Sequence, residues 1–165
     1  MEEAEMPDTR GFRNLMGLFP TGVTIVTVWG DEGPLGMTGN ALASLSLEPM
    51  LIMVGFDLKS RTLKAVERFG RFGVNFLSKD QEEESRRFAS KMPESEKFEG
   101  VPYEISFGVP ILHGTTGWLV CETDALHPAG DHVIAVGRLL AMGRNPAEPE
   151  PLVFYRGHYA SLNGQ

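Results

Sequence analysis

One segment, residues 36–46, is rich in small and hydrogen-bonding side chains. Successive side chains of an extended chain point to opposite faces, so one face of this segment carries four polar residues: Thr38, Asn40, Ser44 and Ser46. Their hydroxyl and amide groups donate and accept hydrogen bonds, which suits phosphate oxygens and the edge of a heteroaromatic ring. The segment therefore predicts a surface for a phosphate-bearing aromatic ligand, although a strand with one face in water has the same pattern.

A second candidate site begins at Ser60, Arg61 and Thr62, which open a predicted helix. The first backbone N–H groups of a helix have no partner within it, and the helix dipole favours negative charge there. With two hydroxyls and the Arg61 guanidinium beside them, these groups would bind an anion such as a phosphate. The alternative is that Ser60 is an ordinary helix N-cap, which is the commoner use of serine at this position.

Two further clusters lie in predicted turns. Gly130, Asp131 and His132 stand between two predicted strands, where a histidine can donate to a second ligand and change charge near neutral pH. An ordinary turn before a strand would use the same Gly-Asp pair. Near the C-terminus, Tyr155 and Arg156 bring an aromatic ring and a cation together, either to stack on a ligand or to close the fold.

Several classes of function are disfavoured by the sequence. It contains no glycine-rich dinucleotide motif, phosphate loop, nucleophile elbow or H-E-x-x-H motif. Cysteine, histidine and carboxylate side chains crowd residues 121–132, but their spacing matches no recognised metal site, so we expect no metal. The formal net charge of −7 argues against a nucleic-acid partner, because phosphate backbones are bound by clustered Lys and Arg.

The chain of 165 residues is of ordinary size for one domain. We expect that domain at residues 9–160, between short tails at 1–8 and 161–165. Cys121 has no cysteine partner in the chain, and the acidic N-terminus does not have the basic start of a secretory signal. No apolar run approaches the length that crosses a bilayer, so a soluble, cytoplasmic protein without a membrane partner is expected.

Strands dominate the predicted secondary structure. Helices are expected at about 12–19, behind a Thr9 cap, and from Ser60 and Ser78, whereas residues 91–110 are expected to be a polar, proline-containing excursion. Extended segments are expected at 23–29, from Gly36 onward, and at 50–56, 72–77, 116–126, 132–142 and 152–155. This pattern favours a mainly β protein, a β-barrel with short capping helices, over alternating βαβ units.

The order of these segments resembles the flavin reductase-like family, the FMN-binding split-barrel proteins that include reductase components of two-component monooxygenases. The resemblance is carried by residues 19–27, 36–46, 60–63, 72–77, 87–89, 130–132 and 155–157. It implies a Greek-key split barrel, a homodimer and transfer of a hydride from NADH or NADPH to FMN or FAD. The reduced flavin would then serve a separate monooxygenase. A flavin-binding electron carrier or sensor of the same fold is the alternative.

The resemblance also implies a role for each candidate residue. Thr38, Asn40, Ala41, Ser44 and Ser46 would line the flavin, and Ser60, Arg61 and Thr62 would hold its phosphate. Phe88 would contact the flavin ring, Gly130, Asp131 and His132 would hold the nicotinamide cofactor, and Tyr155 and Arg156 would lie near the ligands. No catalytic side chain is required, because hydride transfer needs only the two rings held in contact.

Overall fold

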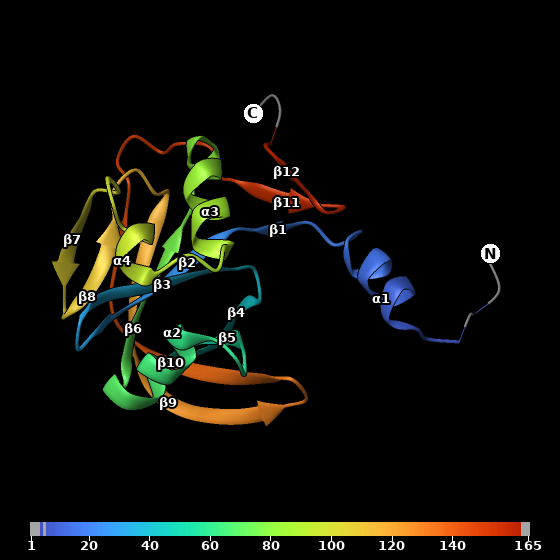
Figure 1. Ribbon diagram of the computed structural model, residues 1–165, viewed down its shortest axis with the longest axis horizontal. Helices are drawn as coiled ribbons and strands as arrows, with labels where there is room; N and C mark the ends of the chain where they lie inside the picture. The colour runs from blue at the N-terminus through green and yellow to red at the C-terminus, as the bar shows by residue number, and fades with distance from the viewer. Residues whose placement is uncertain (1–3, 5, 163–165) are drawn as a thin grey trace.

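The computed structural model describes residue 4 and residues 6–162. Seven antiparallel strands form the main sheet in the order β3-β2-β6-β9-β10-β5-β4 (Figure 1). Their bounds are β2 (Thr24–Gly30), β3 (Gly33–Gly39), β4 (Leu42–Leu47), β5 (Met50–Asp57), β6 (Arg71–Phe76), β9 (Gly117–Ala129) and β10 (His132–Arg144). The predicted mainly β architecture is confirmed.

The two edge strands of this sheet are consecutive in the chain. Only Asn40 and Ala41 join β3 to β4, and three Cα steps span about 11 Å at most. The sheet must therefore curl until its edges approach each other. Within the described residues no ladder pairs β3 with β4, so the barrel remains split along this seam.

Smaller elements surround the barrel. β1 (Thr21–Gly22), β11 (Val153–Tyr155) and β12 (His158–Ala160) form a three-stranded sheet, and β7 (Tyr103–Ser106) pairs with β8 (Val109–Leu112). The helices are α1 (Thr9–Met16), α2 (Arg61–Phe69), α3 (Glu82–Ala89) and α4 (Glu94–Lys97), with a 3-10 turn η1 at Lys79–Gln81. None of these helices in the described residues is long and apolar enough to cross a membrane.

The helix α2 begins and ends as its sequence predicts. The Ser60 side chain accepts a hydrogen bond from Leu63 N at 3.2 Å, and Gly70 ends the helix with a left-handed φ of 66°. Leu63 and Val66 are buried against the barrel. Packing of this apolar face fixes where the N-terminus of α2 lies.

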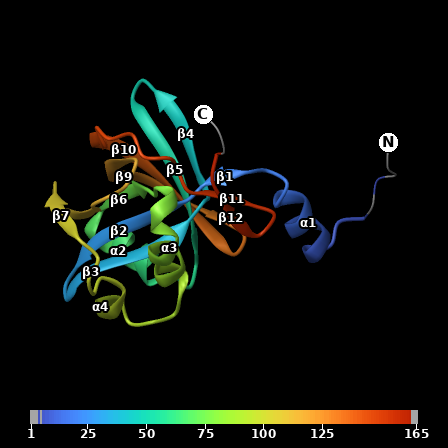
Figure 2. The same cartoon turned by 90° about the horizontal axis from the view of Figure 1, so that it is seen from above.

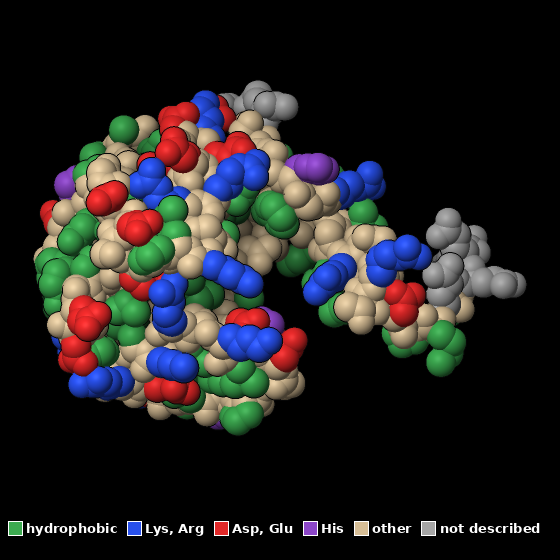
Figure 3. Space-filling view, in the orientation of Figure 1, with side chains coloured by type: hydrophobic (Ala, Val, Ile, Leu, Met, Phe, Trp, Pro, Cys, Tyr) green, Lys and Arg blue, Asp and Glu red, His purple; other side chains and the backbone are tan. Residues whose placement is uncertain are grey.

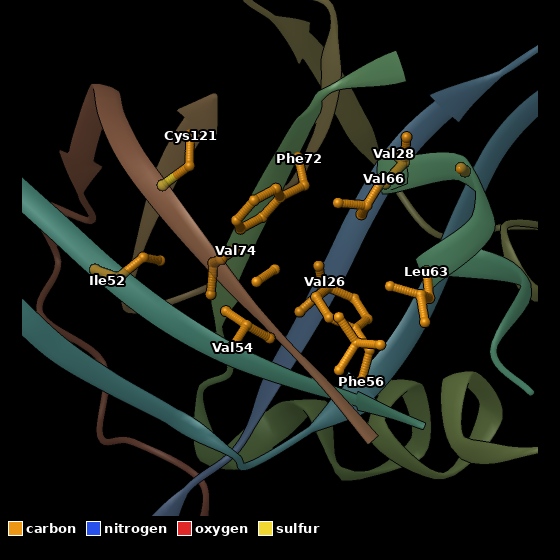
Figure 4. Packing of buried hydrophobic residues seen from close by; sticks show 13 residues of the cluster. Val26, Val28, Ile52, Val54, Phe56, Leu63, Val66, Phe72, Val74 and Cys121 are labelled. Atoms are coloured by element: carbon orange, nitrogen blue, oxygen red, sulfur yellow. The ribbon is translucent and has the colours of Figure 1, made fainter. Parts of the chain in front are cut away.

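The barrel core is built from β-branched and aromatic residues of the central strands (Figure 4). Phe56 and Phe72 meet edge to face with ring centroids 6.4 Å apart. Cys121 is fully buried in the same cluster, and burial raises the pKa of its thiol to about 12. The thiol is therefore neutral at physiological pH, as expected of a core residue rather than a nucleophile.

A buried asparagine joins three strands. Asn75 on β6 is 0% exposed, and its side-chain amide donates to the carbonyl of Ile25 on β2 at 3.0 Å. Its Oδ1 accepts from the backbone N–H of Leu112 on β8 at 2.8 Å. The small sheet β7-β8 is thus fastened to the barrel by polar groups that no water reaches.

The first helix stands away from the barrel in both orientations (Figures 1 and 2). Asp8, rather than the predicted Thr9, is its N-cap and accepts from the N–H groups of Arg10 and Gly11, each at 2.9 Å. None of its residues is buried, so within this chain the helix is not one of the short helices that cap the barrel.

Two other expectations differ from the structure. Residues 36–46 are not one strand, because β3 ends at Gly39 and β4 begins at Leu42 on the opposite edge of the sheet. The excursion at 91–110 holds α4, β7 and the start of β8, stabilised by long-range contacts that leave no local pattern. Of the predicted tails, residues 1–3, 5 and 163–165 lie outside the described residues.

Candidate functional site

The end of β5 brings three of the predicted clusters together. Gly55 N donates to the carbonyl of Ala41 at 2.8 Å, which holds the β3-β4 connection against β5. Asp57, the last residue of β5, pairs with His132, and its carbonyl accepts from Ser60 N at 2.9 Å. The polar connection, the N-terminus of α2 and the Gly-Asp-His turn therefore lie around one strand end.

A large hollow opens beside the β3-β4 connection, between α1 and the barrel (Figure 3). Its volume is about 1240 Å³, and three of the predicted residues line it: Asn40, Ala41 and Arg156. The Asn40 amide donates to the hydroxyl of Thr21 on β1 at 3.0 Å, which orients the amide. A ligand with a flat ring could enter here beside the small side chain of Ala41.

The other predicted polar residues of segment 36–46 do not line this hollow. The Thr38 hydroxyl donates to the carbonyl of Ser85 at 2.6 Å, and this hydrogen bond joins β3 to α3. Ser44 is exposed and Ser46 is half-buried, with a β-bulge at Leu45 between them. The bulge interrupts the alternation of side chains, so the predicted single polar face over residues 38–46 is wrong.

The N-terminus of α2 retains free hydrogen-bond donors. In the described part of the chain, no protein acceptor is recorded for the backbone N–H groups of Arg61 and Thr62. Thr62 as a whole is only 1% exposed, whereas Arg61 is exposed, so a ligand has direct access to Arg61 but not to Thr62. Ser60 is the N-cap, and its hydroxyl also lies 3.3 Å from the sulfur of Met37 on β3.

The Arg61 guanidinium is half exposed and uses one nitrogen for protein contacts. Its Nη2 donates to the carbonyl of Met92 at 2.9 Å and lies 3.0 Å from Glu94 Oε1. Among the described residues Nη1 and Nε have no partner, so they can donate to an anion. These donors, together with the free helix N–H groups, fit the phosphate of a flavin nucleotide.

The Gly-Asp-His turn lies at the solvent-exposed end of the β9-β10 hairpin. Gly130 has a φ of 65°, a conformation that glycine adopts without strain. His132 Nδ1 lies 2.7 Å from Asp131 Oδ1, and this hydrogen bond lowers the pKa of the Asp131 carboxyl. The carbonyl of Asp131 accepts from Leu58 N at 3.1 Å, which holds the turn beside the start of α2.

Three predicted residues lie away from this strand end. Phe88 is 1% exposed and packs edge to face on Phe98 with ring centroids 4.8 Å apart, so its ring lies in the core of this structure, and its contact with the flavin ring stays a prediction. Tyr155 and Arg156 belong to the β11-β12 turn, where the Arg156 guanidinium lies 5.3 Å from the centre of the Tyr155 ring. Arg156 N donates to the carbonyl of Gly17, so this turn is joined to the end of α1 beside the hollow.

Sequence reasoning missed three partners of the candidate residues. Thr21 orients Asn40, while Glu94 and the buried Lys97 lie behind Arg61. Thr21 carried a signal, since it lies in the stretch 19–27 that resembles the family. No sequence signal pointed to Glu94 and Lys97, because a charged pair in a polar segment is usually exposed to water.

The fold and the site define a flavin-binding split barrel. A family model described as "Flavin reductase like domain" matches residues 16–163. The chain belongs to this family.

Curated relatives and solved structures agree with this membership. The reductase subunit HsaB of a flavin-dependent monooxygenase from Mycobacterium tuberculosis is 39% identical over 157 residues, covering 94% of this chain and 83% of that protein. The FMN reductase (NADH) SmoA from Agrobacterium fabrum is 37% identical, covering 96% and 88%. The structure of the NADH:FAD oxidoreductase SgcE6 from Streptomyces globisporus superposes with a TM-score of 0.91 at 32% identity, covering 99% of each chain. The predicted split-barrel fold is thereby confirmed.

Proposed function

We propose that this protein is an NADH-dependent flavin reductase that supplies reduced FMN or FAD to a separate monooxygenase. The observation that carries the proposal is the end of β5, where the β3-β4 connection, the N-terminus of α2 and His132 meet. An anion-binding helix end beside a polar seam suits a flavin nucleotide, and an exposed histidine next to it suits a second nucleotide. The names of the relatives support the same activity and the same partner class.

In the proposed reaction the side chains bind and orient the two ligands and do not react themselves. Bound nicotinamide and flavin supply the hydride-transfer chemistry themselves, so the protein needs to hold the two rings in contact and exclude competing water. Ser60 and Arg61 would hold the flavin phosphate, and the buried Thr62 would support them from behind. Asn40 and Ala41 would lie along the rest of the flavin, with Thr38, Ser44 and Ser46 near its margin.

Steady-state oxidation of the nicotinamide tests this function. The purified protein is mixed in air with NADH or NADPH and with FMN, FAD or no flavin, and the nicotinamide absorbance is followed. Rapid oxidation that depends on added flavin is expected, with NADH preferred. Flavin binding without turnover would instead identify a flavin-binding electron carrier or sensor of the same fold.

Replacement of His132 tests the proposed nicotinamide site. His132→Ala removes one hydrogen bond worth about 1 kcal/mol, so the KM for NADH should rise about fivefold. The KM for flavin should change much less. His113→Ala is the matched control, because His113 is also exposed and, among the described residues, only its backbone makes hydrogen bonds. Equal changes in both KM values would remove His132 from the nicotinamide site.

We further propose that two copies form a homodimer through α1. Phe12, Leu15 and Met16 are 62%, 65% and 50% exposed on this helix, which is a large apolar surface for a segment standing in water. The β4-β5 hairpin carries a matching set of exposed apolar residues, Leu45, Leu47, Met50 and Met53. Their joint burial against a second copy would also cover the hollow beside Asn40.

Sedimentation equilibrium tests the dimer. A dimer is expected at micromolar concentration, and Leu15→Lys should raise its dissociation constant at least about tenfold by placing a charge in an apolar contact. Ile105→Lys is the control, since Ile105 is 51% exposed on β7, away from α1. A monomeric wild type at these concentrations would contradict the proposal.

A further inference from the structure

A buried lysine lies directly behind the proposed phosphate site. The Lys97 side chain at the end of α4 is 5% exposed, and its Nζ lies 3.2 Å from Glu94 Oε1. The same ammonium donates to the carbonyls of Gly36 at 3.3 Å and Phe88 at 3.4 Å. A buried charge persists only where partners compensate it, so Lys97 and Glu94 must be considered together.

Glu94 is shared between Lys97 and Arg61. Its Oε1 lies 3.0 Å from Arg61 Nη2, and its Oε2 accepts from Gly36 N at 3.1 Å. The Glu94 side chain is 14% exposed, so its charge is only weakly screened by water. Glu94 therefore fixes the position of the arginine, but a lone carboxylate there would also cancel the positive charge of Arg61.

We propose that Lys97 is a positioning residue for the flavin phosphate. By neutralising Glu94, Lys97 lets this carboxylate hold Arg61 in place while the positive charge of Arg61 remains available to an anion. Two cations and one carboxylate leave the cluster with one net positive charge, in a protein whose formal net charge is −7. The inference rests on the proposed function, because it requires the phosphate to bind at Ser60 and Arg61.

A purely structural role for Lys97 predicts something different. In that case its hydrogen bonds only join α4 to Gly36 on β3, which lies beside it (Figures 1 and 2), and to Phe88 on α3. Loss of Lys97 would then weaken the binding of every flavin equally. The positioning role requires a loss that depends on the phosphate.

The comparison of FMN with riboflavin, which has the same ring but no phosphate, separates the two roles. Dissociation constants are measured by quenching of flavin fluorescence at low ionic strength, without nicotinamide. Lys97→Met keeps the apolar stem and removes the charge, so the preference for FMN over riboflavin should fall about fivefold. Lys91→Met, an exposed lysine with no ion pair among the described residues, should leave the preference unchanged.

Changes at Glu94 make the test independent of the stability of Lys97→Met. Glu94→Gln removes the negative charge but keeps an acceptor, so the preference for FMN should rise about fivefold. The double variant Glu94→Gln with Lys97→Met should return to the wild-type preference. Equal losses for FMN and riboflavin in Lys97→Met, or no rise in Glu94→Gln, would overturn the positioning role.

Arg61→Ala distinguishes this inference from the proposed function. If Arg61→Ala abolishes the preference for FMN while the variants at Lys97 and Glu94 do not change it, only the positioning role is wrong. If Arg61→Ala itself leaves the preference unchanged, the phosphate does not bind at α2, and both proposals fail.

Discussion

Arg61→Ala is expected to raise the dissociation constant for FMN about tenfold to a hundredfold. Hydrogen bonds from a charged donor contribute about 1.5–3 kcal/mol, and a factor of ten in affinity corresponds to about 1.4 kcal/mol. Riboflavin binding should hardly change, because riboflavin has no phosphate to bind the guanidinium. Titration of flavin fluorescence with both ligands measures the two effects.

The fold should tolerate this substitution. The Arg61 side chain is 50% exposed, and exposed ion pairs contribute about 0–1 kcal/mol to stability. Glu94 retains Lys97 and Gly36 N as partners when Arg61 is removed. Arg68→Ala is the matched control, since Arg68 lies on the same helix and pairs with Asp31 at 2.7 Å. If both variants lose FMN affinity equally, the effect comes from net charge and not from a phosphate site.

The fold class was readable from the sequence because strands and turns leave local patterns. The run at 23–29 became β2, and the helix predicted from Ser78 begins with a local cap, in which Ser78 N donates to Gln81 Oε1 at 3.1 Å. The extended segments expected at 116–126 and 132–142 are β9 and β10, which form a hairpin. Each of these features depends on residues close together in the chain.

Features set by distant contacts were not readable. The break at Asn40 and Ala41 exists because the sheet curls and brings its edge strands together, and nothing within residues 36–46 shows where a sheet ends. The strands β7 and β8 are stabilised by Asn75, which lies more than 25 residues earlier. A polar, proline-containing sequence carries no sign of such a partner.

The residues of the candidate site divide in the same way, into those with a local sequence pattern and those positioned by distant contacts. Ser60 and Arg61 were found because a helix N-terminus has a sequence pattern, and the structure places free donors there. The burial of Phe88 was not predicted, because an aromatic residue on a short helix has the same sequence pattern whether it faces a ligand or a core. Lys97 was missed because its burial depends on Gly36 and Glu94, which the sequence alone does not bring together.

Asn75→Leu is expected to be the most destabilising of these substitutions, lowering the free energy of unfolding by about 2–5 kcal/mol. Leucine fills a similar volume but leaves the N–H of Leu112 and the carbonyl of Ile25 buried without their partner, at about 1–3 kcal/mol each. Such a loss is a large part of the 5–15 kcal/mol typical of a native domain. Urea unfolding at fixed protein concentration, without flavin, measures it.

Asn145→Leu is the control that isolates the effect of burial on the cost of losing these hydrogen bonds. The Asn145 amide donates to the carbonyl of Thr115 at 3.0 Å and accepts from Ala147 N at 3.0 Å, so the same kinds of bond are lost. Asn145 is only partly buried, and water can reach the groups that lose their partner, so a loss of about 1 kcal/mol or less is expected. If both leucine variants unfold at the same urea concentration, the fastening of β8 to the barrel does not depend on Asn75, and apolar contacts of Ile111 and Leu112 must hold the small sheet instead.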